Sequence, residues 1–215
     1  MIEKIVQRSY LKRLDNIIQW QERDVFNRES VSQHSFKVAV FTRVLLDDIF
    51  SNTGLDVEKF KLDCVTHAIF HDWDEAIFLR DVSHSIKYNE FNGIDVRNAI
   101  NDYVKHEFGK EFENIEQYDQ DAYNTLRKSI VEVDQDVKTV VKVADWLGLL
   151  FFCRRELALG NKNFAATYKY CKQGLFKAAA NLATMLAEKY GIDSGKFLEN
   201  VENLTKCNVY GETDF

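Results

Sequence analysis

Apolar residues recur roughly every three or four positions along most of this chain, a period that favours helices over strands. Ile2, Val6, Tyr10, Leu14 and Ile17 form the apolar stripe of a first helix. A second helix opens near Ser30, and further helical patterns cover about 56–71, 94–107, 119–134, 137–159, 162–190 and 194–204. No convincing strand alternation is present, so the sequence predicts an all-α fold.

Local signals mark several of the expected helix ends. The segment "SVSQ" at 30–33 has the pattern of a capping box, in which Ser30 and Gln33 satisfy each other's backbone N–H groups. Gly160 and Gly191 stand where helical patterns stop, as C-terminal glycines commonly do. The chain has no proline and only nine glycines, and no stretch resembles a linker or a repeat, so a single domain is expected.

Composition limits the partners and the compartment. Hydrophobic residues make up 46% of the 215 residues, enough for a core, and the net charge of −6 argues against binding to a nucleic acid polymer. The longest apolar run, "WLGLLFFC", is far short of the ~20 residues of a membrane span. No signal peptide is evident, and the four cysteines lack C-x-x-C spacing. We therefore expect a soluble cytoplasmic protein with no membrane partner.

Polar residues stand on the apolar stripes at three places. His34 precedes Val38 by one helical turn, and His71 continues the stripe of another helix. Asp145 has apolar neighbours at i−4, i+4 and i+7, where an ionised carboxylate costs several kcal/mol unless it is paired. Taken singly, a buried histidine is usually a hydrogen-bonded core residue, and a buried aspartate most often caps a helix or meets an arginine.

Taken together, these residues indicate one shared partner. Two histidines and two carboxylates (His34, His71, Asp72 and Asp145) are all predicted to point inward, and one divalent cation satisfies all four. The vicinal pair His71-Asp72 can aim at one ion because the chain is leaving the helix there. Imidazole and carboxylate ligands suit Mn, Fe, Co, Ni or Zn better than Ca or Mg.

The order His34, His71-Asp72, Asp145 resembles the H…HD…D motif of the HD phosphohydrolase superfamily. The segments "ESVSQHSFKVAVFTRVL", "HDWDEAIFLRDVSHSIKY" and "VKVADWLGLLFFCRRELALGN" are similar to those of its YfbR-like 5′-deoxynucleotidase branch. This resemblance spans about residues 1–170. It implies one HD domain over 1–215, with a catalytic core at about 1–170 and C-terminal helices at about 162–204.

The resemblance also implies roles for single residues. Glu75 matches the family's catalytic glutamate, four residues after His71. Substrate-binding positions are implied at Trp20, at Asp81, and at Lys87 near the end of the substrate loop. Turn formation by Asp81 and simple packing by Trp20 are the alternatives. His84 has no counterpart in the family, and it is a candidate for an added ligand or phosphate contact.

Three departures from the family pattern affect the substrate rather than the metal. Gln19 replaces an arginine before the tryptophan, and Gln33 replaces a glutamate before the first histidine. The substrate loop lacks prolines and is one residue longer between Glu75 and Asp81. The identity of the substrate is therefore less certain than the metal site.

The implied chemistry is metal-assisted hydrolysis of a phosphate ester, with a deoxynucleoside and phosphate as products. The metal would activate water, and Glu75 would orient that water or shuttle a proton. The family resemblance also implies a homodimer. The apolar stripes of 162–204 (Phe164, Tyr168, Leu175, Leu182 and Leu186) would form a dimer face or close the core.

Three alternatives stay open. The same site is compatible with a dNTP triphosphohydrolase, which releases triphosphate from the nucleoside. A binuclear phosphodiesterase needs more histidines near the motif, and only His84 and His106 are available. A non-catalytic HD module for regulation is the third, although such a module has no use for Glu75 beside a full ligand set.

Overall fold

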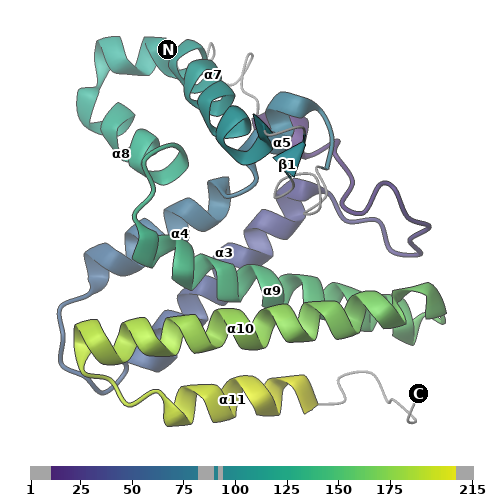
Figure 1. Ribbon diagram of the computed structural model, residues 1–215. Helices are drawn as coiled ribbons and strands as arrows, with labels where there is room; N and C mark the ends of the chain where they lie inside the picture. Colours follow the sequence, from purple (N-terminus) through teal and green to yellow (C-terminus); the bar gives the residue numbers. More distant parts are fainter. Residues whose placement is uncertain (1–10, 82–89, 92–93, 207–215) are drawn as a thin grey trace. The chain divides into compact units, whose positions relative to one another are not determined.

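The computed structural model describes residues 11–81, 90–91 and 94–206, and these are mainly helical (Figure 1). The helices are α2 (Leu11–Leu14), α3 (Val31–Phe50), α4 (Glu58–Phe70), α5 (Trp73–Phe78), α7 (Val96–Tyr118), α8 (Gln120–Ile130), α9 (Gln135–Ala158), the 3₁₀ turn η1 (Lys162–Phe164), α10 (Ala165–Tyr190) and α11 (Gly195–Lys206). Two-residue strands β1 (Glu90–Phe91) and β2 (Ile94–Asp95) pair antiparallel. The all-α prediction is confirmed.

The chain divides into two compact units, and each is described by itself. The first comprises the described parts of 1–24, 28–36 and 69–134, and the second comprises those of 25–27, 37–68 and 135–215. The expectation of a single domain over 1–215 stays a prediction.

The first unit has its own apolar core around Trp73, the first residue of α5. The indole is almost completely buried and contacts the rings of Phe108 and Phe112 on α7. Tyr123 on α8 packs against Phe108 in the same cluster. Burying such rings contributes about 1.5–3 kcal/mol each, so this cluster holds the short helix α5 onto α7. A second small cluster, comprising Leu14, Ile17, Val31 and Ala76, lies in the same unit.

In the second unit, α9 and α10 lie side by side, with α11 along α10 (Figure 1). Gly174 permits the close approach of α9 and α10, because a Cβ at this position would lie only 2.6 Å from the indole of Trp146. Helix α10 ends at Gly191, whose φ of 65° is the left-handed conformation that glycine adopts without strain. The predicted stop is confirmed.

The apolar stripe expected along 162–204 closes the core of this second unit. Phe164, Leu175, Leu182 and Leu186 are all buried. The choice between a core and a dimer face is therefore decided in favour of the core for these side chains.

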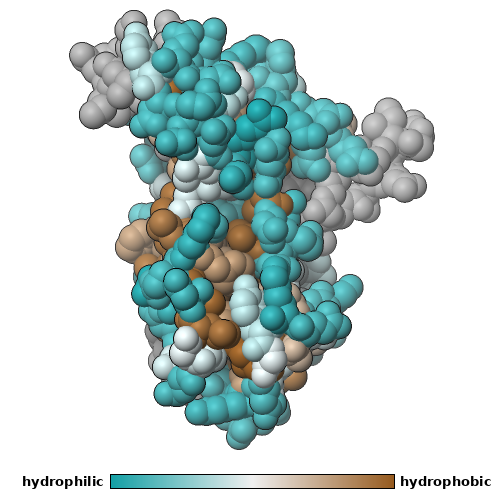
Figure 2. Space-filling view, turned by 90° about the vertical axis from the view of Figure 1, so that its left-hand side faces the viewer, coloured by the Kyte–Doolittle hydropathy of each residue, from teal (hydrophilic) through white to brown (hydrophobic). Residues whose placement is uncertain are grey.

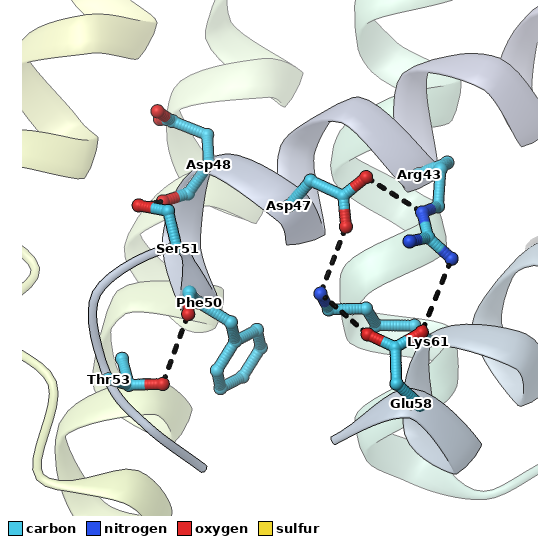
Figure 3. A network of polar contacts seen from close by, with 8 residues as sticks. All are labelled: Arg43, Asp47, Asp48, Phe50, Ser51, Thr53, Glu58 and Lys61. Carbon is cyan, nitrogen blue, oxygen red and sulfur yellow. Dashed lines mark hydrogen bonds and ion pairs between the residues drawn. The ribbon is translucent and has the colours of Figure 1, made fainter. Parts of the chain in front are cut away.

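A network of charged side chains joins α3 to α4 (Figure 3). Asp47 accepts hydrogen bonds from Arg43 at 2.7 Å and from Lys61 at 2.9 Å. Lys61, which is nearly buried, also lies 3.1 Å from Glu58. The Arg43 guanidinium, with help from Lys61, holds the pKa of Asp47 below its ordinary value of 3.8. This network stabilises the helix pair most when Asp47 is ionised.

A buried carboxylate also fastens a loop to α9. Glu156 is fully buried and accepts hydrogen bonds from the backbone N–H groups of Phe26 at 2.8 Å and Asn27 at 2.7 Å. The side-chain amide of Asn161 donates a third, at 2.7 Å. Three donors compensate the cost of burying this charge, and two of them hold the loop to α9.

Apolar atoms gather on one face of the molecule (Figure 2). Val40 and Val44, one turn apart on α3, and Leu62 on α4 are among the exposed large apolar side chains. Among the described residues, no helix has the length and apolar character needed to span a membrane.

Candidate metal centre

His34 lies on the buried side of the first turns of α3, as predicted, and it is only 1% exposed. The predicted capping box precedes it: Ser30 N–H donates to Oε1 of Gln33 at 3.0 Å, and Gln33 N–H donates to Oγ of Ser30 at 3.2 Å. Gln33 therefore has a structural task in starting the helix. The cap fixes the helix start that carries His34.

His71 and Asp72 occupy the turn between α4 and α5, as expected for a pair at a helix end. Nε2 of His71 lies 3.0 Å from Oδ2 of Asp72. Asp72 is the N-cap residue of α5, but its side chain makes no capping hydrogen bond. Its carboxylate is thus directed to the imidazole and not to the start of the helix.

The two imidazoles converge within the first unit. The rings of His34 and His71 have centroids 5.4 Å apart, and a ring nitrogen of each lies within 4.8 Å of the other. Ligand atoms on one first-row metal ion, bound at about 2.1 Å, lie about 3 Å apart when they are neighbours. The His71–Asp72 separation meets this value, and the two imidazoles lie close enough to bind one divalent transition metal ion.

Glu75 lies in the first turn of α5 and is 3% exposed. Its backbone N–H donates to the carbonyl of Asp72 at 3.1 Å, which ties it to the HD pair. The guanidinium of Arg80, five residues later, pairs with Glu22. A buried carboxylate one turn from two candidate ligands suits acid–base work.

Trp20 and Asp81 are linked directly. The backbone N–H of Trp20 donates to Oδ2 of Asp81 at 2.5 Å. Trp20 has a φ of 60°, a left-handed conformation that costs a non-glycine residue about 1–3 kcal/mol. Asp81 therefore does more than form a turn, since it holds Trp20 in an unusual backbone conformation. Contact of either residue with substrate stays a prediction.

Asp145 belongs to the second unit, on α9. It is 8% exposed, as the apolar neighbours in its helix predict, and it accepts a hydrogen bond from Nζ of Lys142 at 2.8 Å. The same ammonium lies 5.1 Å from the centroid of the Trp146 ring. The carboxylate is thus buried beside a cation one turn earlier on its own helix, which compensates part of the cost of its charge.

The remaining sequence predictions fall elsewhere. Lys87 and His84 lie outside the described residues. His106 is exposed on α7, 4.0 Å from Glu107, so it gives no support to a second metal site. Gln19 is buried, and its Oε1 has no hydrogen-bond partner within the part of the chain that the structure describes.

Glu29 is a residue that the sequence reasoning missed. It is buried, and its Oε1 lies 3.8 Å from Nδ1 of His34. The available signal was an acidic residue directly before the capping box of a helix whose inner face carries a histidine. An acid in that place is ordinarily taken as a favourable charge near a helix N-terminus.

The sequence pattern of one protein family, described as 5′-deoxynucleotidase YfbR-like, matches residues 8–190. Among curated proteins, the 4′-phosphooxetanocin A phosphatase of Priestia megaterium is 27% identical over 153 residues. That match covers 70% of this chain and 73% of the phosphatase.

Solved structures agree on the fold. A protein of Pyrococcus horikoshii OT3 is 25% identical with a TM-score of 0.60, and the match covers 95% of this chain and 99% of that one. An HD-domain phosphohydrolase from Listeria innocua is 19% identical with a TM-score of 0.59, covering 96% and 98%. The resemblance noted in the sequence is confirmed. Because the family pattern covers well over half of the chain, this protein belongs to the YfbR-like 5′-deoxynucleotidase family.

Proposed function

We propose that this phosphomonoester hydrolase is a metal-dependent 5′-deoxynucleotidase, which converts deoxynucleoside 5′-monophosphates to deoxynucleosides and phosphate. The observation that carries the proposal is the 3.0 Å approach of His71 Nε2 to Asp72 Oδ2 beside the ring of His34, in a chain of this family. Two imidazoles and a carboxylate form a donor set for a first-row metal.

The proposed ligands are His34, His71, Asp72 and Asp145. Support for the histidines comes from the proximity of their rings, and support for Asp72 comes from its contact with His71. Support for Asp145 is its burial and its place in the H…HD…D order of the sequence. Mn, Co, Fe, Ni and Zn all suit this set. When bound, the ion would supply Lewis acidity toward the phosphate and lower the pKa of a water molecule.

Glu75 is the proposed acid–base residue. Its burial keeps the carboxylate away from bulk water. In this role it accepts a proton from the attacking water and delivers one to the leaving 5′-oxygen of the sugar. Its place one turn after Asp72 suits a group that hydrogen-bonds the water without becoming a ligand.

Trp20 and Asp81 are proposed to recognise the sugar. The hydrogen bond between them fixes the tryptophan against a chain segment 61 residues away. A rigid indole restricts the space for a 2′-hydroxyl, which supports a preference for deoxyribose. Lys87 and His84 remain proposed substrate contacts on the strength of the sequence alone.

A phosphomonoester substrate is favoured over a triphosphate. The relative from Priestia megaterium is named a phosphatase, and the family is named for a 5′-deoxynucleotidase. Both names describe release of a phosphate group rather than of triphosphate. The buried Glu75 also argues against a module that only binds metal, because burying a carboxylate without use is costly.

We also propose a cytoplasmic homodimer. Leu175, Leu182 and Leu186 of α10 are buried inside the second unit, so these side chains are not available to a partner. The exposed Val40 and Val44 on α3 are better candidates for a contact between subunits, and Figure 2 shows apolar atoms gathered on one face. Apolar surface of this kind commonly marks protein contacts.

Product analysis tests the proposed function. The purified protein is incubated with Mn or Co and with deoxynucleoside monophosphates, ribonucleoside monophosphates or dNTPs, and the products are separated by chromatography. Phosphate and deoxynucleoside from the monophosphates are the expected result. Triphosphate released from dNTPs would establish the rival reaction, and no turnover of any substrate would support a non-catalytic role.

A further inference from the structure

The carboxylate of Glu29 is buried against the imidazole of His34. The two side chains are 4% and 1% exposed, and Oε1 of Glu29 lies 3.8 Å from Nδ1 of His34. A charge buried to this extent costs several kcal/mol unless its surroundings compensate it. The imidazole of His34 is one group that faces this buried carboxylate.

The backbone on both sides of this carboxylate is fixed. Gln19 N–H donates to the carbonyl of Glu29 at 2.9 Å, and residues 18 and 30 form an antiparallel bridge. The next residue, Ser30, begins the capping box, and its carbonyl accepts from the N–H of His34 at 3.0 Å. Glu29 and His34 thus stand on one hydrogen-bonded piece of backbone, which sets how the carboxylate meets the ring.

We propose that Glu29 is the positioning residue of His34. Its carboxylate faces Nδ1 at 3.8 Å, and this nearby negative charge favours the tautomer with the proton on Nδ1, which leaves the lone pair of Nε2 for a metal. Asp72 differs, because it lies at Nε2 of His71, on the ligand side of that ring. This role rests on the proposed function, since it requires that His34 binds the metal.

The test compares Glu29→Ala and Glu29→Gln with wild type in the full chain. Co²⁺ affinity is measured by titration calorimetry, and ligand geometry by the visible absorption of bound Co²⁺. Loss of an outer partner of this kind weakens metal binding about 10–100-fold, and we expect this for the alanine variant. Glutamine keeps the size of the side chain and an oxygen that faces Nδ1, so it should retain more of the affinity than alanine does. The absorption bands should change with alanine.

Glu107→Gln is the matched control. Glu107 is a buried carboxylate in the same unit, on α7, and it pairs with Lys110 at 2.9 Å. This variant should bind Co²⁺ as wild type does. Wild-type affinity and spectrum in Glu29→Ala would overturn the role of Glu29 alone, as would loss of the fold in both Glu29 variants. No Co²⁺ binding by wild type would overturn the metal site and, with it, the role of Glu29.

Discussion

The backbone N–H of Trp20 donates a 2.5 Å hydrogen bond to Oδ2 of Asp81, 61 residues further along the chain. Hydrogen bonds to charged groups contribute about 1.5–3 kcal/mol, enough to offset the strain of the left-handed Trp20 backbone. The side chain of Asp81 therefore stabilises the left-handed backbone conformation of Trp20, the other predicted substrate-binding residue.

Replacement of Asp81 by alanine should lower the selectivity for deoxyribose over ribose. Without its acceptor, the Trp20 backbone is free to leave the left-handed region, and the indole then guards the 2′ position poorly. We expect the ratio of kcat/KM for deoxyribo- over ribonucleoside monophosphates to fall. Asp81→Asn keeps an acceptor oxygen, so this ratio should fall less in that variant. An unchanged ratio in Asp81→Ala would show that Asp81 does not act through Trp20.

Replacement of Glu75 by alanine should separate chemistry from metal binding. A general acid–base group contributes about 10²–10⁴-fold to rate, so kcat should fall by that factor while metal content stays the same. Asp74→Ala is the control, because it removes a neighbouring carboxylate of α5. Metal content, melting temperature and kcat are measured on both. A folded, metal-loaded Glu75→Ala protein with nearly normal kcat would end the catalytic assignment.

Asp145→Ala should lose metal and activity together. Removing one of four proposed ligands leaves the ion held by three, and the Lys142 ammonium that now binds Asp145 at 2.8 Å would lose its carboxylate. Elemental analysis after dialysis gives the metal content, and phosphate release gives the activity. Full metal content with unchanged affinity would remove Asp145 from the ligand set.

Gly174→Ala should destabilise the second unit. The added methyl group would lie 2.6 Å from the indole of Trp146, next to Asp145, so α9 and α10 must separate or the indole must turn. Overpacking of this kind costs about 1–3 kcal/mol. Gly109→Ala on α7 is the control: nothing lies within 4 Å of its Cβ, and it should raise stability slightly. Equal melting temperatures would show that Trp146 moves without cost.

Asp47→Asn should lower the free energy of unfolding only at pH values where the wild-type carboxylate is charged. Arg43 and then Lys61 lower the Asp47 pKa, so its contribution is complete above about pH 3.8 and is lost as the pH falls through the lowered pKa. At pH 7 the loss should be about 0.5–1 kcal/mol, because the side chain is half exposed. Urea unfolding at pH 7 and near pH 3 measures both values. If the difference in unfolding free energy between wild type and Asp47→Asn persists at low pH, the effect comes from packing and not from charge.

The sequence predicted features that depend on local periodicity. The helix containing His34, its capping box and the stop at Gly191 each follow from residues within a few positions of one another, because helix hydrogen bonds are local. The burial of His34 and Asp145 also follows from neighbours one turn away.

Contacts between distant segments could not be predicted in this way. The link from Trp20 to Asp81 joins residues 61 positions apart and leaves no periodic pattern. The contact of Glu29 with His34 is local, but Glu29 precedes the helix, so the helical period does not predict it. The six-residue helix α5 was not expected as a separate element, because its apolar contacts come from α7. The sequence predicted that the first helix continues to Ile17, but α2 ends at Leu14. Residues 17–19 instead form backbone hydrogen bonds with 29–31.

The hydrogen bonds from the loop at Phe26 and Asn27 to the buried Glu156 predict slow hydrogen exchange of these amides. Phe26 presents a ring that is 62% exposed, and its loop would ordinarily exchange its amide protons within moments. Yet its N–H and that of Asn27 are bound by a buried carboxylate on α9. Such amides exchange only when the contact opens. In deuterated buffer, the amides of Phe26 and Asn27 should keep their protons longer than amides of an exposed loop do.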